Sequence, residues 1–206
     1  MASSMKRTSR NISAGKRGAR AARKRLDSSP LPGRTFALPP TVSKPDLLDT
    51  NRKTDRCFRQ FLYDFSVLGD HLEKARAYLA SQLGLSSPQY NVVMIVAQYQ
   101  GKAGVSVSEV ARHLHVTTAF IAAEAARLNR MGWIRKHPNP RDGRGVLLRL
   151  SPRGQTKILR IGPRRLAVND HLFRSLSGKK FHQLARTVAS LIDDFSETIQ
   201  LLAIGR

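Results

Sequence analysis

The chain has 206 residues and carries 36 Lys and Arg against 14 Asp and Glu, which gives a net charge of +22. This excess of positive charge excludes a neutral or acidic soluble enzyme as the first interpretation and favours a polyanionic partner. With 41% hydrophobic residues the chain has enough apolar material for a core, which excludes a wholly disordered protein.

Residues 1–44 are predicted to form a disordered basic arm. The first 25 residues hold nine basic side chains and no acid, which leaves +13 of the net charge for the rest of the chain. Small and polar residues with several prolines cannot bury enough surface to order this segment. Two interpretations stay open: a solvated extension, or an arm that adds sequence-independent phosphate contacts.

A long amphipathic helix is predicted over residues 54–83, because apolar residues recur there at steps of three and four. Gly84 ends this helix. Ser87 then supplies an N-cap and Pro88 a helix-compatible first turn for a second helix that ends near Gln100. The second helix is nearly all apolar, so we expect it to be central.

Two short helices joined by a tight turn are predicted next. Ser106 and Glu109 have the spacing of a capping box, in which each side chain binds a free backbone N–H at a helix start. After a turn at residues 114–116, Thr117 is the predicted N-cap of a helix that continues to Met131. The result is a helix-turn-helix.

A β-hairpin is predicted after the helix-turn-helix. Two short extended segments, residues 133–137 and 146–150, flank a tip rich in proline and glycine. The hairpin lies within the second concentration of charge, where twelve basic residues between Arg127 and Arg165 face one acid, Asp142. Clustered cations of this kind favour a nucleic-acid surface over a merely solvated one.

Two more helices complete the chain. Ser151 and Pro152 begin a helix that is expected to be interrupted or kinked at Gly162-Pro163 and to end near Leu176, and Ser177 is the expected cap of the last one. The first and last long helices have wide apolar stripes that a monomer would leave exposed. The fold class is therefore mainly α with a small β-hairpin.

Three motifs along this part of the chain occur together at a characteristic spacing. They are Leu85 to Tyr90, Val107 to Leu114, and the wing motif of Asp142-Gly143-Arg144 followed by Leu150-Ser151-Pro152-Arg153-Gly154. With these motifs, and Leu128 to Ile134 between the last two, residues 50–204 resemble the MarR family of bacterial winged helix-turn-helix transcriptional regulators. The resemblance implies a MarR-type domain at 45–206, with the winged helix-turn-helix at about 87–152 and dimerisation helices at about 50–84 and 153–204.

The resemblance implies a homodimer that binds double-stranded DNA at a palindromic operator. Each subunit would place its recognition helix in a major groove and its wing near a minor groove. Asp142 would orient Arg144 rather than touch DNA. The DNA-binding residues expected on this basis are Thr117, Thr118, Ala119, Ala122, Ala123, Arg127, Arg141 and Arg144.

The recognition helix departs from the family pattern, because small residues stand where many members carry polar or basic side chains. Thr118 and the alanine methyl groups can pack on thymine methyl groups but form few base-specific hydrogen bonds. Arg141 and Arg144 would read a narrow A·T-rich minor groove. We therefore expect modest specificity, a preference for A·T-containing sites and strong salt dependence.

The family resemblance also implies a repressor that a small aromatic or phenolic effector releases from DNA. Such a molecule would bind between the dimerisation helices and the DNA-binding lobe and favour one dimer conformation. Aromatic and cationic residues in about the right elements are candidates for its contacts: Phe65, His71, Arg76 and Tyr90.

Two alternative functions stay open. The first is a weakly specific, DNA-coating or architectural protein without an effector, which the alanine-rich recognition helix and the basic arm favour. The second is a thiol-based peroxide-sensing repressor that uses Cys57, because Cys57-Phe58 resembles the peroxide-sensing branch of the family and Arg56 and Arg59 would lower the pKa of the thiol.

No sequence motif points to catalysis, a metal or a cofactor. His113 and His115 are two residues apart and so do not share a helix face, and Cys57 is the single cysteine of the chain. No apolar run is long enough to span a bilayer, and the first 25 residues lack the apolar block of a secretory signal. We expect a cytoplasmic, non-enzymatic protein that does not contact membranes.

Overall fold

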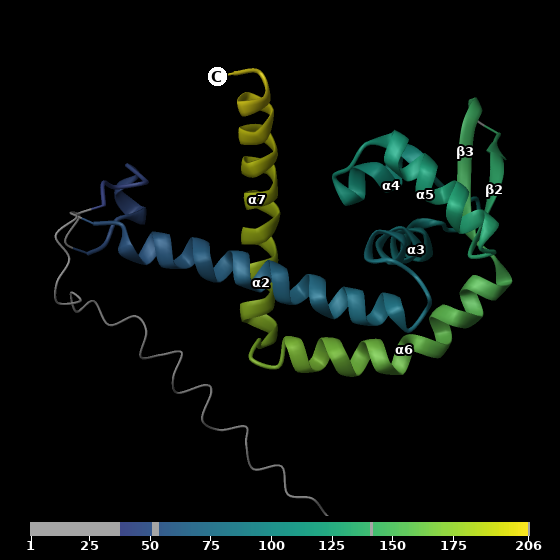
Figure 1. The fold of residues 1–206 in the computed structure, drawn as a ribbon, viewed down its shortest axis with the longest axis horizontal. Coiled ribbons are helices and arrows are strands. Elements are labelled where there is room, and N and C mark those ends of the chain that lie inside the picture. The colour runs from purple at the N-terminus through teal and green to yellow at the C-terminus, as the bar shows by residue number, and fades with distance from the viewer. Residues whose placement is uncertain (1–37, 51–53, 141, 206) are drawn as a thin grey trace, which may run out of the picture. The chain divides into compact units, whose positions relative to one another are not determined.

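The computed structural model describes residues 38–50, 54–140 and 142–205, with only the backbone for 142–144 (Figure 1). The chain divides into two compact units, Met1–Asp70 and His71–Arg206. Helix α2 runs across the boundary between them. The elements are η2 (Pro45–Leu47), α2 (Arg56–Ser81), α3 (Ser87–Tyr99), β1 (Val105–Ser106), α4 (Val107–Leu114), α5 (Thr118–Arg130), β2 (Ile134–Asn139), β3 (Asp142–Leu150), α6 (Pro152–Leu172) and α7 (Gly178–Ala203).

In the first unit, two aspartates tie the segment before α2 to the start of that helix. Asp49 accepts hydrogen bonds from the backbone N–H groups of Arg56 (3.0 Å) and Cys57 (3.1 Å), which lie in the first turn of α2. The buried Asp55 accepts from the amide (2.5 Å) and the hydroxyl (2.7 Å) of Thr41, within residues 38–44 at the end of the predicted arm. Asp49 also accepts from the hydroxyl of Thr54, and this hydrogen bond does most to lower the pKa of its carboxyl, while the hydrogen bonds from Thr41 lower the pKa of Asp55.

The core of the second unit surrounds α3, as the nearly all-apolar sequence of this helix predicts. Val92, Val93 and Val96 are fully buried. Helices α4 and α5, the end of α2 and the inner faces of the strands supply most of the other buried side chains, including Ile121, Leu128 and Leu148. The helix-turn-helix is thereby fixed against one central helix.

The predicted hairpin is confirmed, and it belongs to a three-stranded antiparallel sheet with strand order β1-β3-β2. Strand β1 was not predicted, because it has only two residues, which pair with Leu147 and Leu148 of β3. Strand β2 pairs with β3 along its length, beginning with Ile134 opposite Leu150 and ending with Asn139 opposite Asp142. The register shifts after Pro138. The proline is tolerated because β2 is an edge strand.

The predicted helix caps are mostly confirmed. Ser106 and Glu109 form the capping box of α4, while Thr117 and Ser151 cap α5 and α6 by accepting backbone hydrogen bonds three residues ahead. Ser177 occupies the N-cap position of α7 but makes no capping hydrogen bond with its side chain.

Two predictions about helix ends were wrong. Ser86, rather than Ser87, caps α3, because its side chain forms a reciprocal capping box with Gln89. Helix α6 continues through Pro163 and ends at Leu172 instead of near Leu176, so of the two predicted outcomes it is not interrupted, but it bends partway along its length (Figure 1). The carbonyl that Pro163 leaves unbonded belongs to Leu159, whose side chain is 77% exposed, so this part of α6 faces outward.

Among the described residues, no helix is long and apolar enough to cross a membrane.

Candidate nucleic-acid interface

The turn between α4 and α5 fixes how α5 begins. His115 adopts a left-handed conformation (φ 53°) at the end of α4, and the amide of Val116 donates to the carbonyl of Ala111 at 3.1 Å. Thr117 then accepts a hydrogen bond from the amide of Phe120 at 3.2 Å. These local bonds close α4 and start α5 within three residues, as a helix-turn-helix requires.

The outer face of α5 carries the predicted DNA-binding residues of this helix. Thr118, Ala119, Ala122, Ala123 and Arg127 are all exposed, whereas Ile121, Ala125 and Leu128 are buried. The exposed surface also includes Phe120, which is 39% exposed, and Arg130. Sequence reasoning missed these two residues, although Arg130 follows Ala123 by seven positions and so shares its helix face.

A third residue of α5 was missed because it is polar within an apolar stripe. Glu124 is buried, and its Oε1 accepts a hydrogen bond from Nη1 of Arg127 at 2.5 Å. Its position, three residues after Ile121 and four before Leu128, is the signal that predicts burial.

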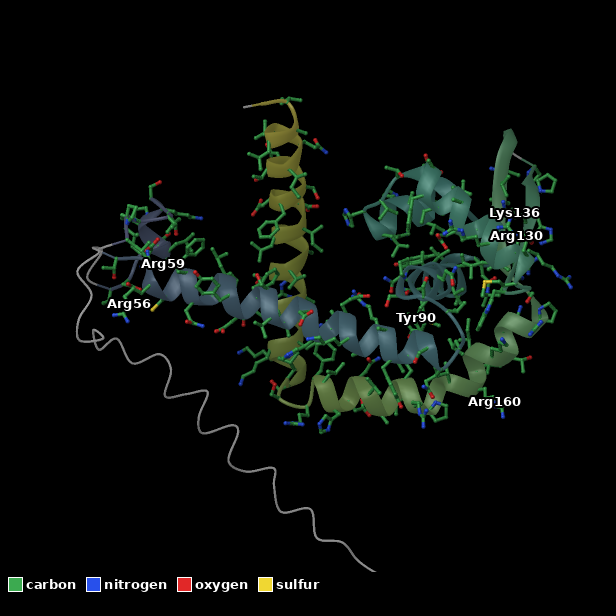
Figure 2. The ribbon with its side chains drawn as sticks, in the orientation of Figure 1. Arg56, Arg59, Tyr90, Arg130, Lys136 and Arg160 are labelled. Atoms are coloured by element: carbon green, nitrogen blue, oxygen red, sulfur yellow. The ribbon has the colours of Figure 1, made fainter. Side chains whose placement is uncertain are left out.

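The wing presents cations on both of its strands. Arg135 and Lys136 of β2 are exposed, as is Arg149 of β3. Arg135 and Arg149 lie directly opposite each other across the two strands. Like charges in this arrangement repel each other, so a polyanion bound beside them would relieve the repulsion. Figure 2 shows Lys136 on the wing and Arg130 on α5.

The remaining residues predicted to act in DNA binding belong to the wing tip. Arg141 lies outside the described residues, and the side chains of Asp142 and Arg144 are not described, although both residues belong to β3. Their roles in contacting DNA and in orienting the wing arginine stay predictions.

Close contacts of residues 132–133 with residues 151–154 hold the wing to the start of α6, and we call this region the joint. The amide of Ser151 donates to the carbonyl of Trp133 at 3.0 Å, and the Ser151 hydroxyl donates to the carbonyl of Gly132 at 2.6 Å. The same hydroxyl accepts from the amide of Gly154 at 2.9 Å. A Cβ atom on Gly154 would lie 2.3 Å from the Trp133 carbonyl oxygen, so only glycine fits here.

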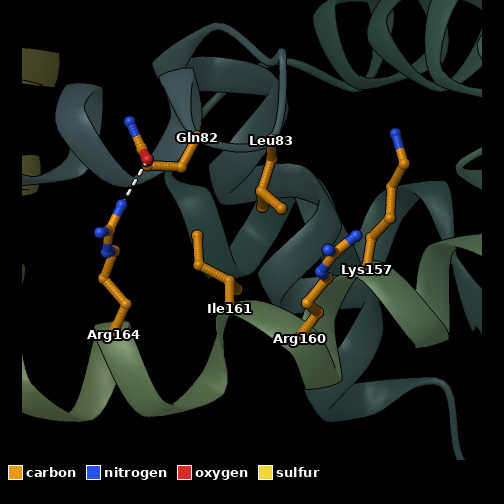
Figure 3. A pocket seen from close by; sticks show the side chains of 6 residues that line it. All are labelled: Gln82, Leu83, Lys157, Arg160, Ile161 and Arg164. Carbon is orange, nitrogen blue, oxygen red and sulfur yellow. Dashed lines mark hydrogen bonds between the residues drawn. The ribbon is translucent and has the colours of Figure 1, made fainter.

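Three cations of α6 lie around a cavity rather than on the outer face of α5. A cavity of about 320 Å³ lies between α6 and the end of α2 (Figure 3). Its lining contains three cations and no acid: Gln82, Leu83, Lys157, Arg160, Ile161 and Arg164. Arg164 donates to Oε1 of Gln82 at 2.5 Å, and Lys157 lies 4.6 Å from the centre of the Trp133 ring. The sequence showed one run of charge, which the fold divides between two surfaces.

The residues proposed from the sequence to bind an effector do not line this cavity. Tyr90 is 6% exposed and packs in the core of the second unit. His71 is exposed, Arg76 lies 3.6 Å from the carboxylate of Glu73, and Phe65 belongs to the first unit. Their role in effector binding stays a prediction.

The surroundings of Cys57 differ from those expected of a reactive thiol. The residue is exposed, and the nearby Asp49 raises the pKa of its thiol through a hydrogen bond, more than Arg56 lowers it. Arg56 does lower this pKa, as the sequence predicts, but the effect of Asp49 is larger, so the net shift is upward. A raised pKa reduces the thiolate fraction, and the thiolate is the form that peroxide oxidises.

Comparison with known proteins finds a local sequence match and similar solved structures. The sequence model described as MarR family matches residues 83–145. No curated protein sequence matches the chain significantly. Sco3205 from Streptomyces coelicolor, a MarR family transcriptional regulator in complex with DNA, superimposes with a TM-score of 0.58 at 20% identity, covering 72% of this chain and 93% of its own.

Two further solved structures have the same fold. AbsC, a MarR family transcriptional regulator from Streptomyces coelicolor, gives a TM-score of 0.57 at 18% identity and covers 70% of this chain and 96% of its own. MepR from S. aureus, solved with DNA, gives a TM-score of 0.57 at 14% identity and covers 65% of this chain and 97% of its own.

Proposed function

We propose that the chain is a homodimeric repressor of the MarR type that a small aromatic or phenolic molecule releases from a palindromic operator, because residues 83–145 match the sequence model described as MarR family. The observation that carries the DNA-binding part is the exposed outer face of α5 beside the cationic wing. Sco3205 and MepR, which have this fold, were both solved with DNA.

The exposed apolar side chains of the long helices support a dimer. Helix α7 has no buried residue, and large apolar side chains on it are 40% to 68% exposed. They include Phe181, Leu184, Ile192, Ile199 and Leu202. Monomeric proteins rarely expose a continuous apolar surface of this extent, and a second copy of the chain offers the same apolar helices as a partner.

The DNA-binding proposal predicts a difference between operator and random DNA. The purified full chain is titrated onto duplex from its own upstream region and onto a random duplex of equal length, at several salt concentrations. We expect a discrete complex on the upstream duplex that persists at salt concentrations that dissociate the random duplex. Phosphate contacts make both affinities fall with salt, whereas base and shape readout favours the operator only.

The alternative is a DNA-coating protein without an effector. The alanine face of α5 favours it, because methyl groups supply little hydrogen-bonding specificity. Equal affinity for the two duplexes, with an equal dependence of affinity on salt concentration, would contradict the repressor and support this alternative.

Repression is tested separately with a reporter driven by the upstream region, whose expression should fall when the protein is present.

The cavity between α6 and the end of α2 is the best candidate for the effector site. Lys157, Arg160 and Arg164 can pair with a carboxylate or phenolate, and Leu83 and Ile161 can contact an aromatic ring. The joint at Trp133 fixes the start of α6 to the wing. A ligand held between α6 and the end of α2 therefore couples the long helices to the DNA-binding lobe.

Salicylate tests this site as a representative aromatic carboxylate. We expect it to weaken operator binding of the wild-type chain about tenfold, which is within the usual range of allosteric coupling. Arg160→Gln should abolish this response, while Arg174→Gln, an exposed cation outside the cavity, should keep it. An unchanged response in Arg160→Gln, or none in the wild type, would argue against the cavity as the effector site.

A further inference from the structure

The recognition helix α5 contains a buried carboxylate. Glu124 is 5% exposed and belongs to the same stripe as Ile121 and Leu128, which are fully buried. An ionised side chain in such surroundings is costly unless a partner compensates its charge. Glu124 therefore requires an explanation that helix packing alone does not give.

The compensating partner is Arg127. Its Nη1 donates to Oε1 of Glu124 at 2.5 Å, and its side chain is 58% exposed, compared with 7% for the side chain of Glu124. The second carboxylate oxygen, Oε2, is buried and has no hydrogen-bond partner in the part of the chain that the structure describes. One end of the pair is thus anchored in the core, and the other reaches the surface.

This geometry restrains the arginine on the outer face of the helix. Side chains in a helix lean toward its N-terminus, so a pair with the residue three positions earlier draws the guanidinium toward the first turns of α5. The exposed residues there include Ala119 and Ala123, which offer only methyl groups. Arg127 retains further N–H donors after one is used by Glu124.

We propose that Glu124 is a positioning residue that holds the guanidinium of Arg127 in place for hydrogen bonding to DNA. The proposal depends on the DNA contact through α5 proposed above. A free arginine loses much rotamer freedom when it binds, whereas one already held in place loses less. Glu124 thereby supplies, through Arg127, a polar contact that the alanine face lacks.

A positioning role and a purely electrostatic role of Glu124 predict opposite changes in DNA affinity when Glu124 is removed. Removing a carboxylate near the DNA strengthens binding if the residue acts only through its charge. Removing it weakens binding if Arg127 depends on it. Glu124→Leu tests this in the full chain, because leucine fills the buried site without leaving an unpaired charge.

The second variant is Glu124→Leu combined with Arg127→Ala, which removes both charges. We expect Glu124→Leu to weaken operator binding about tenfold, which is the usual effect of losing one good arginine contact. The slope of the logarithm of affinity against the logarithm of salt concentration should become less steep by about one. The double variant should then bind within about twofold of Glu124→Leu, because Arg127 contributes little once it is released. Thermal unfolding of both variants checks that the fold is kept.

Asp170→Asn is the matched control, since it removes an exposed negative charge on α6. Its operator affinity should equal or slightly exceed that of the wild type. Wild-type or tighter binding by Glu124→Leu overturns the proposal if the double variant is clearly weaker, because Arg127 then contacts DNA without Glu124. If both variants bind like the wild type, Arg127 makes no DNA contact, and the positioning proposal fails together with the proposed DNA contact of Arg127.

Discussion

Gly154→Ala is expected to destabilise the protein by about 3 kcal/mol, at the upper end of the usual cost of overpacking. The added Cβ would lie 2.3 Å from the carbonyl oxygen of Trp133. That carbonyl cannot move aside freely, because it accepts a hydrogen bond from Ser151 and leads directly into β2. The strain would therefore loosen the joint between the wing and α6.

Thermal unfolding followed by circular dichroism measures this effect at a fixed protein concentration, since association shifts Tm. A loss of about 3 kcal/mol lowers Tm by roughly 6–12 °C for a chain of this size. Gly178→Ala is the control, because it lies in the first turn of α7 and an added Cβ meets nothing within 4 Å. A Tm for Gly154→Ala that matches this control would contradict the close approach to Trp133.

If the chain forms the proposed dimer through α7, Ile199→Glu is expected to dissociate it and to weaken operator binding a hundredfold or more. Ile199 is 65% exposed in the single chain, so a glutamate costs little in a monomer. Between two copies the same glutamate would be an unpaired buried charge. Two half-sites bound by one dimer gain about 10² to 10⁴ in avidity, which a monomer loses.

Sedimentation velocity and operator titration measure the two consequences of Ile199→Glu separately. The matched control is Gln200→Glu, which adds the same charge at an exposed polar position of the same helix. We expect the control to remain dimeric and to bind DNA with nearly unchanged affinity. If Ile199→Glu dimerises like the wild type, the apolar surface of α7 near Ile199 is not part of the dimer interface.

Peroxide sensing through Cys57 is less well supported than release by a small-molecule effector. Asp49 raises the pKa of the Cys57 thiol, whereas peroxide sensing needs a lowered one. The proposed release by a small-molecule effector, by contrast, has a cavity with suitable charges between α6 and the end of α2.

The sequence by itself determined the features that depend on neighbouring residues. The caps at Ser106, Thr117 and Ser151 join groups three residues apart, and the glycine and proline signals act within one turn. The apolar periodicity of α2 and α7 and the hairpin follow from equally local patterns. For the same reason the order of the long helices, the helix-turn-helix and the two hairpin strands, and with it the fold class, was predicted correctly, whereas β1 was not.

Only the tertiary structure decided which surface each residue belongs to. The cations between Arg127 and Arg165 form one run in the sequence, but packing places some on α5 and the wing and others around a cavity with Gln82, far away in the chain. The closeness of Gly154 to Trp133 and the pairing of β1 with β3 also join distant segments. Sequence spacing encodes contacts within a helix turn or a strand, whereas these contacts depend on how whole elements pack against α3.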